Sequence, residues 1–243
     1  MPLGLPQFIP LVGAVGISGL GVAALAGLLA GWGLLALTLR GAPSGLRAAV
    51  AALAGPLLVG ALCGARLGNQ LQAPDLRWSQ PFTWLAITGT SLSFTGGLVG
   101  AAASAWLGAR PLPAAVRWAA LDALAPGACL AVALGWLGLP APGRLGGFPV
   151  GPVGVQPVQL YALLGFAALA AALCWQWGRR DYPGQNAAAF VVLASTFRFV
   201  LAFGEQSTPV LGPWSLTQLG DGGAALAGLV LTAWLAARGA RLS

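Results

Sequence analysis

Histidine and lysine are missing from this chain of 243 residues, and acidic side chains number only 5. Without histidine, imidazole acid–base chemistry and histidine-ligated metals are excluded. Cysteine is scarce too, and Cys63, Cys129 and Cys174 lie in separate apolar runs without metal-ligand spacing. We therefore expect three small core residues, no metal site and no cofactor. Charged residues make up only 7% of the chain, against roughly 25% in a soluble domain, so they cannot cover a soluble surface.

What the chain does contain is apolar sequence. Hydrophobic residues make up 58% of it, and its mean hydropathy is +0.82. A membrane-spanning helix needs roughly 20 apolar residues, which leaves room for about seven spans. Sustained period-two alternation, the pattern of a β-barrel, does not occur. We predict an all-α, polytopic membrane protein in which residues 1–243 form a single transmembrane helical domain.

Loop signals place the spans along the chain. The first apolar run has no basic residue before Arg40 and is too long for a signal peptide, so we expect a membrane helix with the N-terminus outside. A Gly/Pro-rich segment at about 140–157 is expected to form an outer loop. The predicted spans are residues 11–39, 48–71, 82–108, 118–139, 158–177, 187–203 and 218–237.

Most of the arginines fall on one side of this alternation, and the positive-inside rule makes that side the cytoplasm. The C-terminus is then cytoplasmic as well. We interpret the net charge of +7 as a signal of membrane orientation and expect no nucleic-acid partner. The arginines on this side are Arg40, Arg47, Arg110, Arg117, Arg179, Arg180, Arg238 and Arg241.

The other arginines are Arg66, Arg77, Arg144 and Arg198, and all fall toward the outer half of the membrane. Charged side chains are costly there and often mark function. They either extend to outer phosphates or line a pocket for an anionic lipid headgroup, a role that suits the bidentate guanidinium.

The few acidic residues include two near the ends of predicted spans. Asp122, near the inner end of the fourth span, is expected to pair with Arg117 or to cap a broken helix. Asp221, just inside the last span, could neutralise an outer arginine.

Several short motifs occur together in an order and spacing that resemble the bacterial prolipoprotein diacylglyceryl transferase family. They cover about residues 60–240, and the first span shows no clear match. The motifs are Gly64-Ala-Arg-Leu-Gly68, Ser93-Phe-Thr-Gly-Gly-Leu-Val-Gly100, Asp122-Ala-Leu-Ala-Pro126, Gly143-Arg-Leu-Gly-Gly-Phe148, Gln156-Pro-Val-Gln-Leu-Tyr161 and Phe197-Arg198.

The resemblance implies a seven-helix enzyme of the bacterial plasma (inner) membrane that acts in lipoprotein biosynthesis. Its partners would be phosphatidylglycerol and a prolipoprotein signal peptide, and the diacylglyceryl group would move to the thiol of the lipobox cysteine. Arg144 and Arg198 would be catalytic, stabilising the leaving phosphate. The residues expected to bind lipid or substrate are Arg66, Gly96, Gly97, Gln159 and Tyr161. For the two glycines, simple helix packing is the alternative.

Several polar residues of the family are replaced in this chain. Thr95 stands where the family has histidine, Gly147 replaces asparagine, and Pro152 replaces glutamate. Gln156 replaces a second histidine, and Ala202 replaces the glutamate of the sixth span. Two other functions therefore stay open: a degenerate homologue that binds anionic lipid without turnover, and an unrelated small membrane transporter.

Overall fold

The computed structural model describes the chain except for residues 1–7, 13–14, 73–91, 139–157, 205–208 and 240–243. The described part is dominated by helices, with two short antiparallel hairpins, β1 (Phe8–Val12) with β2 (Val15–Ser18) and β3 (Pro209–Leu211) with β4 (Trp214–Ser215). The helices are α1 (Gly19–Thr38), α2 (Ser44–Gln72), α4 (Phe94–Gly108), α5 (Ala114–Gly135), α6 (Val158–Trp177), α7 (Gln185–Leu201) and α8 (Leu216–Gly239), with short 3₁₀ turns η1 (Trp136–Gly138) and η3 (Ala202–Gly204).

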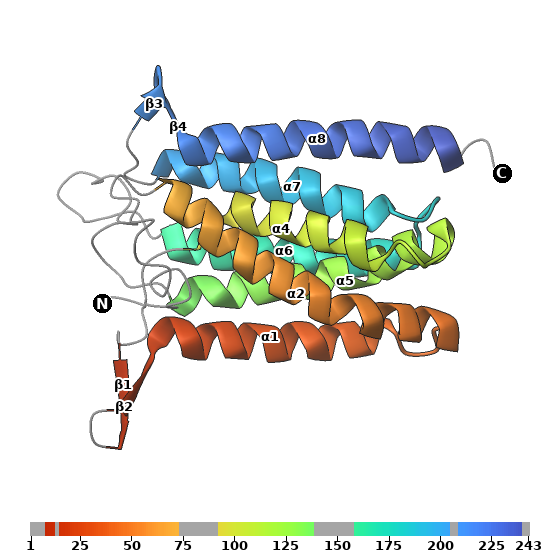
Figure 1. Cartoon of the computed structure of the whole chain (residues 1–243), viewed down its shortest axis with the longest axis horizontal. Coiled ribbons are helices and arrows are strands. Elements are labelled where there is room, and N and C mark those ends of the chain that lie inside the picture. Colours follow the sequence, from red (N-terminus) through yellow and green to blue (C-terminus); the bar gives the residue numbers. More distant parts are fainter. Residues whose placement is uncertain (1–7, 13–14, 73–91, 139–157, 205–208, 240–243) are drawn as a thin grey trace.

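The helices form a bundle in which the axes lie roughly along one common direction and successive helices run antiparallel (Figure 1). Within the described residues, five of them are long and apolar enough to cross a membrane, namely α2, α5, α6, α7 and α8. A shorter apolar helix covers Val22–Thr38 of α1. Large apolar side chains remain exposed on the outside of the bundle, as expected for surfaces that face lipid. The chain is thus a polytopic membrane protein.

The predicted spans match these helices closely, with differences at their ends. The fifth span coincides with α6, whereas the structure has the paired strands β1 (Phe8–Val12) and β2 (Val15–Ser18) where the first span was expected to begin. Helices α2 and α5 begin earlier than predicted, directly after Pro43 and Pro113. A helix can include arginines in its first turn, because their long side chains extend to the interface. Residues 82–91, the start of the third predicted span, lie outside the described residues.

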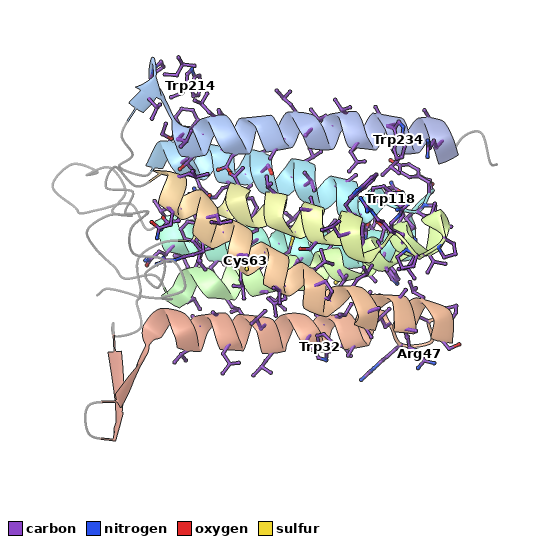
Figure 2. All side chains as sticks on the ribbon, viewed as in Figure 1. Trp32, Arg47, Cys63, Trp118, Trp214 and Trp234 are labelled. Atoms are coloured by element: carbon purple, nitrogen blue, oxygen red, sulfur yellow. The ribbon has the colours of Figure 1, made fainter. Side chains whose placement is uncertain are left out.

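One end of the bundle collects the arginine-bearing turns. This basic end comprises the end of α1 with the start of α2, the end of α4 with the start of α5, the end of α6 with the start of α7, and the end of α8. Trp118 and Trp234 lie against each other there, with ring centroids 6.3 Å apart, while Trp214 lies at the opposite end (Figure 2). Tryptophan at both ends is the arrangement expected at the two membrane interfaces.

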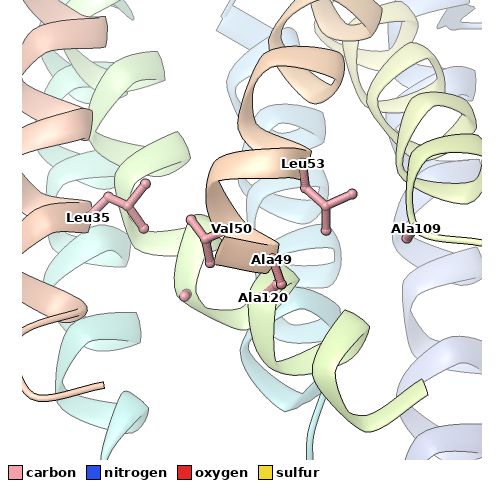
Figure 3. Packing of buried hydrophobic residues seen from close by; sticks show 7 residues of the cluster. Leu35, Ala49, Val50, Leu53, Ala109 and Ala120 are labelled. Atoms are coloured by element: carbon pink, nitrogen blue, oxygen red, sulfur yellow. The ribbon is translucent and has the colours of Figure 1, made fainter. Parts of the chain in front are cut away.

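Small residues let the helices approach closely. A core near the basic end joins α1, α2 and α5 through Leu35, Val50, Leu53 and several alanines (Figure 3). Farther along, α2 and α4 are in backbone contact: a Cβ on Gly64 would lie 2.7 Å from the Cα of Gly100. Packing of this kind replaces the hydrophobic effect as the force between helices in lipid.

Asp122 ties α5 to the start of α7. Its carboxylate is fully buried and accepts hydrogen bonds from the backbone N–H groups of Gly184 (2.7 Å) and Ala187 (2.9 Å). The Arg180 guanidinium approaches it at 3.7 Å. The expected capping role is therefore confirmed, although the capped helix is α7 and the paired cation is Arg180 instead of Arg117. A negative charge at a helix N-terminus is stabilised by the free N–H groups and the helix dipole.

Candidate functional site

Arg198 lies at the end of the bundle opposite the basic end, and we call this end the Arg198 end. It comprises the ends of α2, α5 and α7 and the starts of α4, α6 and α8. The Arg198 side chain is only 7% exposed. It lies in the last turn of α7, where the carbonyl ends of the helix favour a cation by roughly 0.3–1 kcal/mol. The guanidinium also lies 5.2 Å from the centroid of the Trp136 ring.

Aromatic packing holds this part of α7 in place. The Phe166 ring of α6 lies 5.4 Å from Phe197 and 5.8 Å from Phe94 of α4, between ring centroids. Phe197 also packs directly on Gly165, where no side chain larger than hydrogen would fit. Since Phe197 is the neighbour of Arg198, this chain of rings joins three helices and restricts the position of the cation.

The start of α4 is anchored to the end of α2. Ser93 caps α4 by accepting a hydrogen bond from the Gly96 N–H at 3.2 Å, and its own N–H donates to the Ala65 carbonyl at 2.9 Å. Arg66, the residue after Ala65, is half-buried beside this junction. The structure thus brings Arg66 to the start of α4 on the Arg198 end of the bundle.

The two glycines expected to bind lipid face α2. A Cβ on Gly96 would lie 3.0 Å from the Cα of Gly68, and one on Gly97 would lie 3.4 Å from the Ala61 carbonyl oxygen. These contacts match the helix-packing alternative for Gly96 and Gly97. They also explain why the start of α4 can lie so near Arg66.

Between these glycines and the cap, Thr95 makes a contact that the sequence did not predict. Its hydroxyl donates a hydrogen bond to Oδ1 of Asp221 at 2.5 Å, which joins α4 to α8. Asp221 is fully buried, whereas Thr95 is only half-buried. The two residues are separated by 126 positions in the chain, so no local pattern could have paired them.

Of the remaining predicted site residues, some lie in the described part of the chain and some lie outside it. Gln159 and Tyr161 lie in the first turn of α6, with Gln159 half-buried and Tyr161 46% exposed. Ala202 is buried in η3. Arg144, together with the expected outer loop at 140–157 and the replaced positions in it, lies outside the described residues, as do Asp75, Arg77 and Glu205. Helix ends from α2, α4, α6, α7 and α8 therefore converge around the described part of the site.

The chain is similar to known proteins of one family. The prolipoprotein diacylglyceryl transferase family matches residues 6–236. A phosphatidylglycerol–prolipoprotein diacylglyceryl transferase of Nitratidesulfovibrio vulgaris is 33% identical over 169 residues, covering 64% of this chain and 63% of that protein. Proteins of the same name from Chromohalobacter salexigens and Aromatoleum aromaticum are 31% and 30% identical, over 72% and 65% of this chain and 72% and 66% of their own lengths.

The chain spans about two thirds of the length of these curated relatives (63–72%). The family match, in contrast, runs through nearly all of this chain and includes every helix described above except the last three residues of α8. It excludes an unrelated transporter and agrees with the motifs that surround Arg66, Thr95 and Arg198. This protein belongs to the prolipoprotein diacylglyceryl transferase family.

Proposed function

We propose that this protein transfers the diacylglyceryl group of phosphatidylglycerol to the thiol of a lipobox cysteine in exported prolipoproteins. The proposal rests on the family match and on the names of the relatives, which state both substrate classes. The signal peptide with its lipobox would approach from the membrane, and the setting would be the bacterial inner membrane. The whole chain would form one transmembrane domain.

In this reaction the cysteine sulfur attacks the glycerol carbon that carries the phosphate ester. A carbon–sulfur bond forms, the carbon–oxygen bond breaks, and glycerol phosphate leaves with the bonding electron pair. Negative charge therefore grows on the phosphate as the reaction proceeds. Hydrogen-bond donors that are fixed in place before the reaction stabilise that charge most strongly, because little reorganisation is needed.

The observation that carries the proposal is the burial of Arg198. An arginine 7% exposed inside an apolar bundle is costly, and Trp136 and the end of α7 both favour its charge. Its planar fork matches phosphate oxygens. Arg198 would hold the leaving phosphate, with Arg144 as the second catalytic arginine. Arg66, Gln159 and Tyr161 would bind the lipid and orient it, while Gly96 and Gly97 would shape the wall of the site.

We further propose seven membrane spans, formed by α1 to α8 with α4 as part of the third. The successive helices alternate in direction, and the arginine-bearing turns gather at one end (Figure 1). Arginine-rich turns stay in the cytoplasm. The basic end would then be cytoplasmic together with the C-terminus, the N-terminus would be outside, and the Arg198 end would face the outer leaflet.

The test is transfer of radiolabelled diacylglyceryl from phosphatidylglycerol vesicles to a lipobox peptide by the reconstituted full chain. Wild type should form product. Arg198→Ala should reduce turnover about 10²–10³-fold, the effect of removing one preorganised donor to a developing anion. Arg198→Lys should recover only part of it, since lysine lacks the fork. Arg179→Ala is the matched control, because Arg179 lies at the basic end, stacked on Trp175 at 4.5 Å, and should retain activity.

Each other outcome has a definite meaning. If the wild-type chain binds phosphatidylglycerol but transfers nothing, the protein is the lipid-binding homologue without turnover. If Arg198→Ala turns over as fast as wild type, the role of Arg198 is wrong. In a transferase-depleted bacterium, wild type should restore growth, whereas Arg144→Ala should not. Rescue by Arg144→Ala would remove that arginine from the mechanism.

A further inference from the structure

The hydrogen bond between Thr95 and Asp221 joins a half-buried hydroxyl on α4 to a fully buried carboxylate on α8. We propose that it forms a proton relay for the substrate thiol, with the Thr95 hydroxyl touching the substrate and Asp221 acting through it. This inference rests on the proposed transferase function and names the residues that would take up the proton released in it. The hydrogen bond of 2.5 Å between them is already formed in the structure.

The packing around the pair favours one fixed geometry. Asp221 is fully buried, and its carboxylate accepts a hydrogen bond from the half-buried Thr95 hydroxyl. Gly220 allows the close approach of the two helices, since a Cβ there would lie 3.1 Å from both Oγ1 and Cγ2 of Thr95. Thr95 is half-buried at the start of α4. Its hydroxyl donates to Asp221 and retains lone pairs that can accept a hydrogen bond from a substrate thiol.

The Thr95–Asp221 pair lies near Arg198, the proposed phosphate-binding residue, along the length of the bundle. On α7, Phe199 follows Arg198, and a Cβ on Gly222 of α8 would lie 3.6 Å from the Phe199 ring. Asp221, next to Gly222, is therefore at the same depth in the bundle as Arg198. Phe94, next to Thr95, reaches the same level through Phe166 and Phe197.

The charges around Asp221 come from few elements. Among the described elements that pack on α8, α4 and the β3–β4 hairpin contain no titratable side chain, and α7 contributes Arg198 alone. The other titratable residue on α8 is Arg238, at the basic end. The Asp221 carboxylate accepts the hydrogen bond of the Thr95 hydroxyl and can take up a proton through it.

The proton balance is simple. The substrate S–H gives its proton to Oγ1 of Thr95 while the Thr95 hydroxyl proton moves to Oδ1 of Asp221. The sulfur attacks the glycerol carbon as the carbon–oxygen bond breaks, and glycerol phosphate leaves. Asp221 afterwards returns the proton through Thr95 to the departing phosphate or to water. Histidine and lysine side chains are missing from the whole chain, so a carboxylate and a hydroxyl are among the few side chains available for this step.

The experiment measures kcat from pH 7 to pH 9 for reconstituted wild type, Asp221→Asn, Thr95→Val and Thr95→Ser. About 3% of a thiol with an ordinary pKa of about 8.5 is ionised at pH 7, so a variant without the relay should lose about 30-fold there. Near pH 9 the thiolate forms by itself, and the loss should fall below about twofold. Thr95→Ser keeps the hydroxyl and should remain within about threefold of wild type. The KM for phosphatidylglycerol should stay unchanged in all of them.

Controls separate this role from a structural one. Thr232→Val makes the same change on α8 at a hydroxyl that donates only to the Gly228 carbonyl of its own helix (2.8 Å), and should leave the pH profile as in wild type. A loss in Asp221→Asn or Thr95→Val that is equal at every pH would overturn the relay in favour of a packing role, as would full activity of either variant at pH 7. If wild type itself forms no product at any pH, the proposed function fails as well, whereas an active wild type with unaffected variants refutes the relay alone.

Discussion

Replacing Asp122 by asparagine isolates the energetic value of the carboxylate that joins α5 to α7. Its oxygens accept from two different backbone N–H groups, Oδ2 from Gly184 and Oδ1 from Ala187. Asparagine has one acceptor oxygen, so its amide NH₂ must face the second N–H. The variant loses one hydrogen bond to a charged acceptor, about 1.5–3 kcal/mol, and the attraction of Arg180 at 3.7 Å. We expect a total of about 2–4 kcal/mol.

The assay is thermal unfolding of the purified chain in detergent, followed by circular dichroism. For 150–250 residues, roughly 2–4 °C corresponds to each kcal/mol, so the midpoint should fall by about 4–16 °C. Asp181→Asn is the control, because this neighbouring carboxylate is exposed and its loss should cost less than about 0.5 kcal/mol. The kcat of Asp122→Asn at low temperature should match wild type, since Trp136 beside Arg198 is 14 residues farther along α5 and η1, about 21 Å away. A midpoint within about 1 °C of wild type would refute the reasoning.

Three further substitutions test other contacts. Gly64→Ala should separate α2 from α4 and lower the unfolding midpoint, whereas Gly55→Ala on the same helix should not, because a Cβ there meets nothing within 4 Å. If both substitutions changed the unfolding midpoint equally, helix propensity and not the contact between α2 and α4 would determine the change. Trp136→Leu should slow transfer by about 2–30-fold, equivalent to a cation–π contact of roughly 0.5–2 kcal/mol, and should add nothing in an Arg198→Ala background. The pKa of Tyr182 is raised, mainly by burial and to a lesser extent by the nearby carboxylates. The stability that Tyr182 contributes is therefore fully present below about pH 10, the pKa of tyrosine in the unfolded chain, and is lost as pH rises through the higher pKa of the folded state. Tyr182→Phe should consequently unfold less readily than wild type in an alkaline titration.

The membrane class and the approximate positions of most helices could be predicted from the sequence. Apolar runs of about 20 residues between polar turns have few alternatives, since every backbone group in lipid must bond within its own helix. The helix ends were less certain, because Arg47 and Arg117 lie inside first turns and extend their side chains to the interface. The hairpin at residues 8–18 was missed because its composition is as apolar as a helix.

Motif order was sufficient to identify the family and to select Arg66, Arg198, Gln159 and Tyr161, all of which the structure places on helix ends at the Arg198 end of the bundle. Their catalytic and binding roles remain predictions. Gly96 and Gly97 carried two interpretations that the motif alone could not separate, and in the structure both glycines face α2.

The sequence by itself determined which segments are apolar enough to form membrane helices and that most arginines lie in the turns between them, because hydropathy and charge act through local composition. Only the tertiary structure decided which buried acids meet which partners. Asp122, expected to pair with Arg117 or to cap a broken helix, caps the start of α7, and Asp221 meets Thr95 across 126 residues. Such pairings depend on which helices become neighbours and at what depth, and in lipid that choice is made by small-residue contacts spread over several helices.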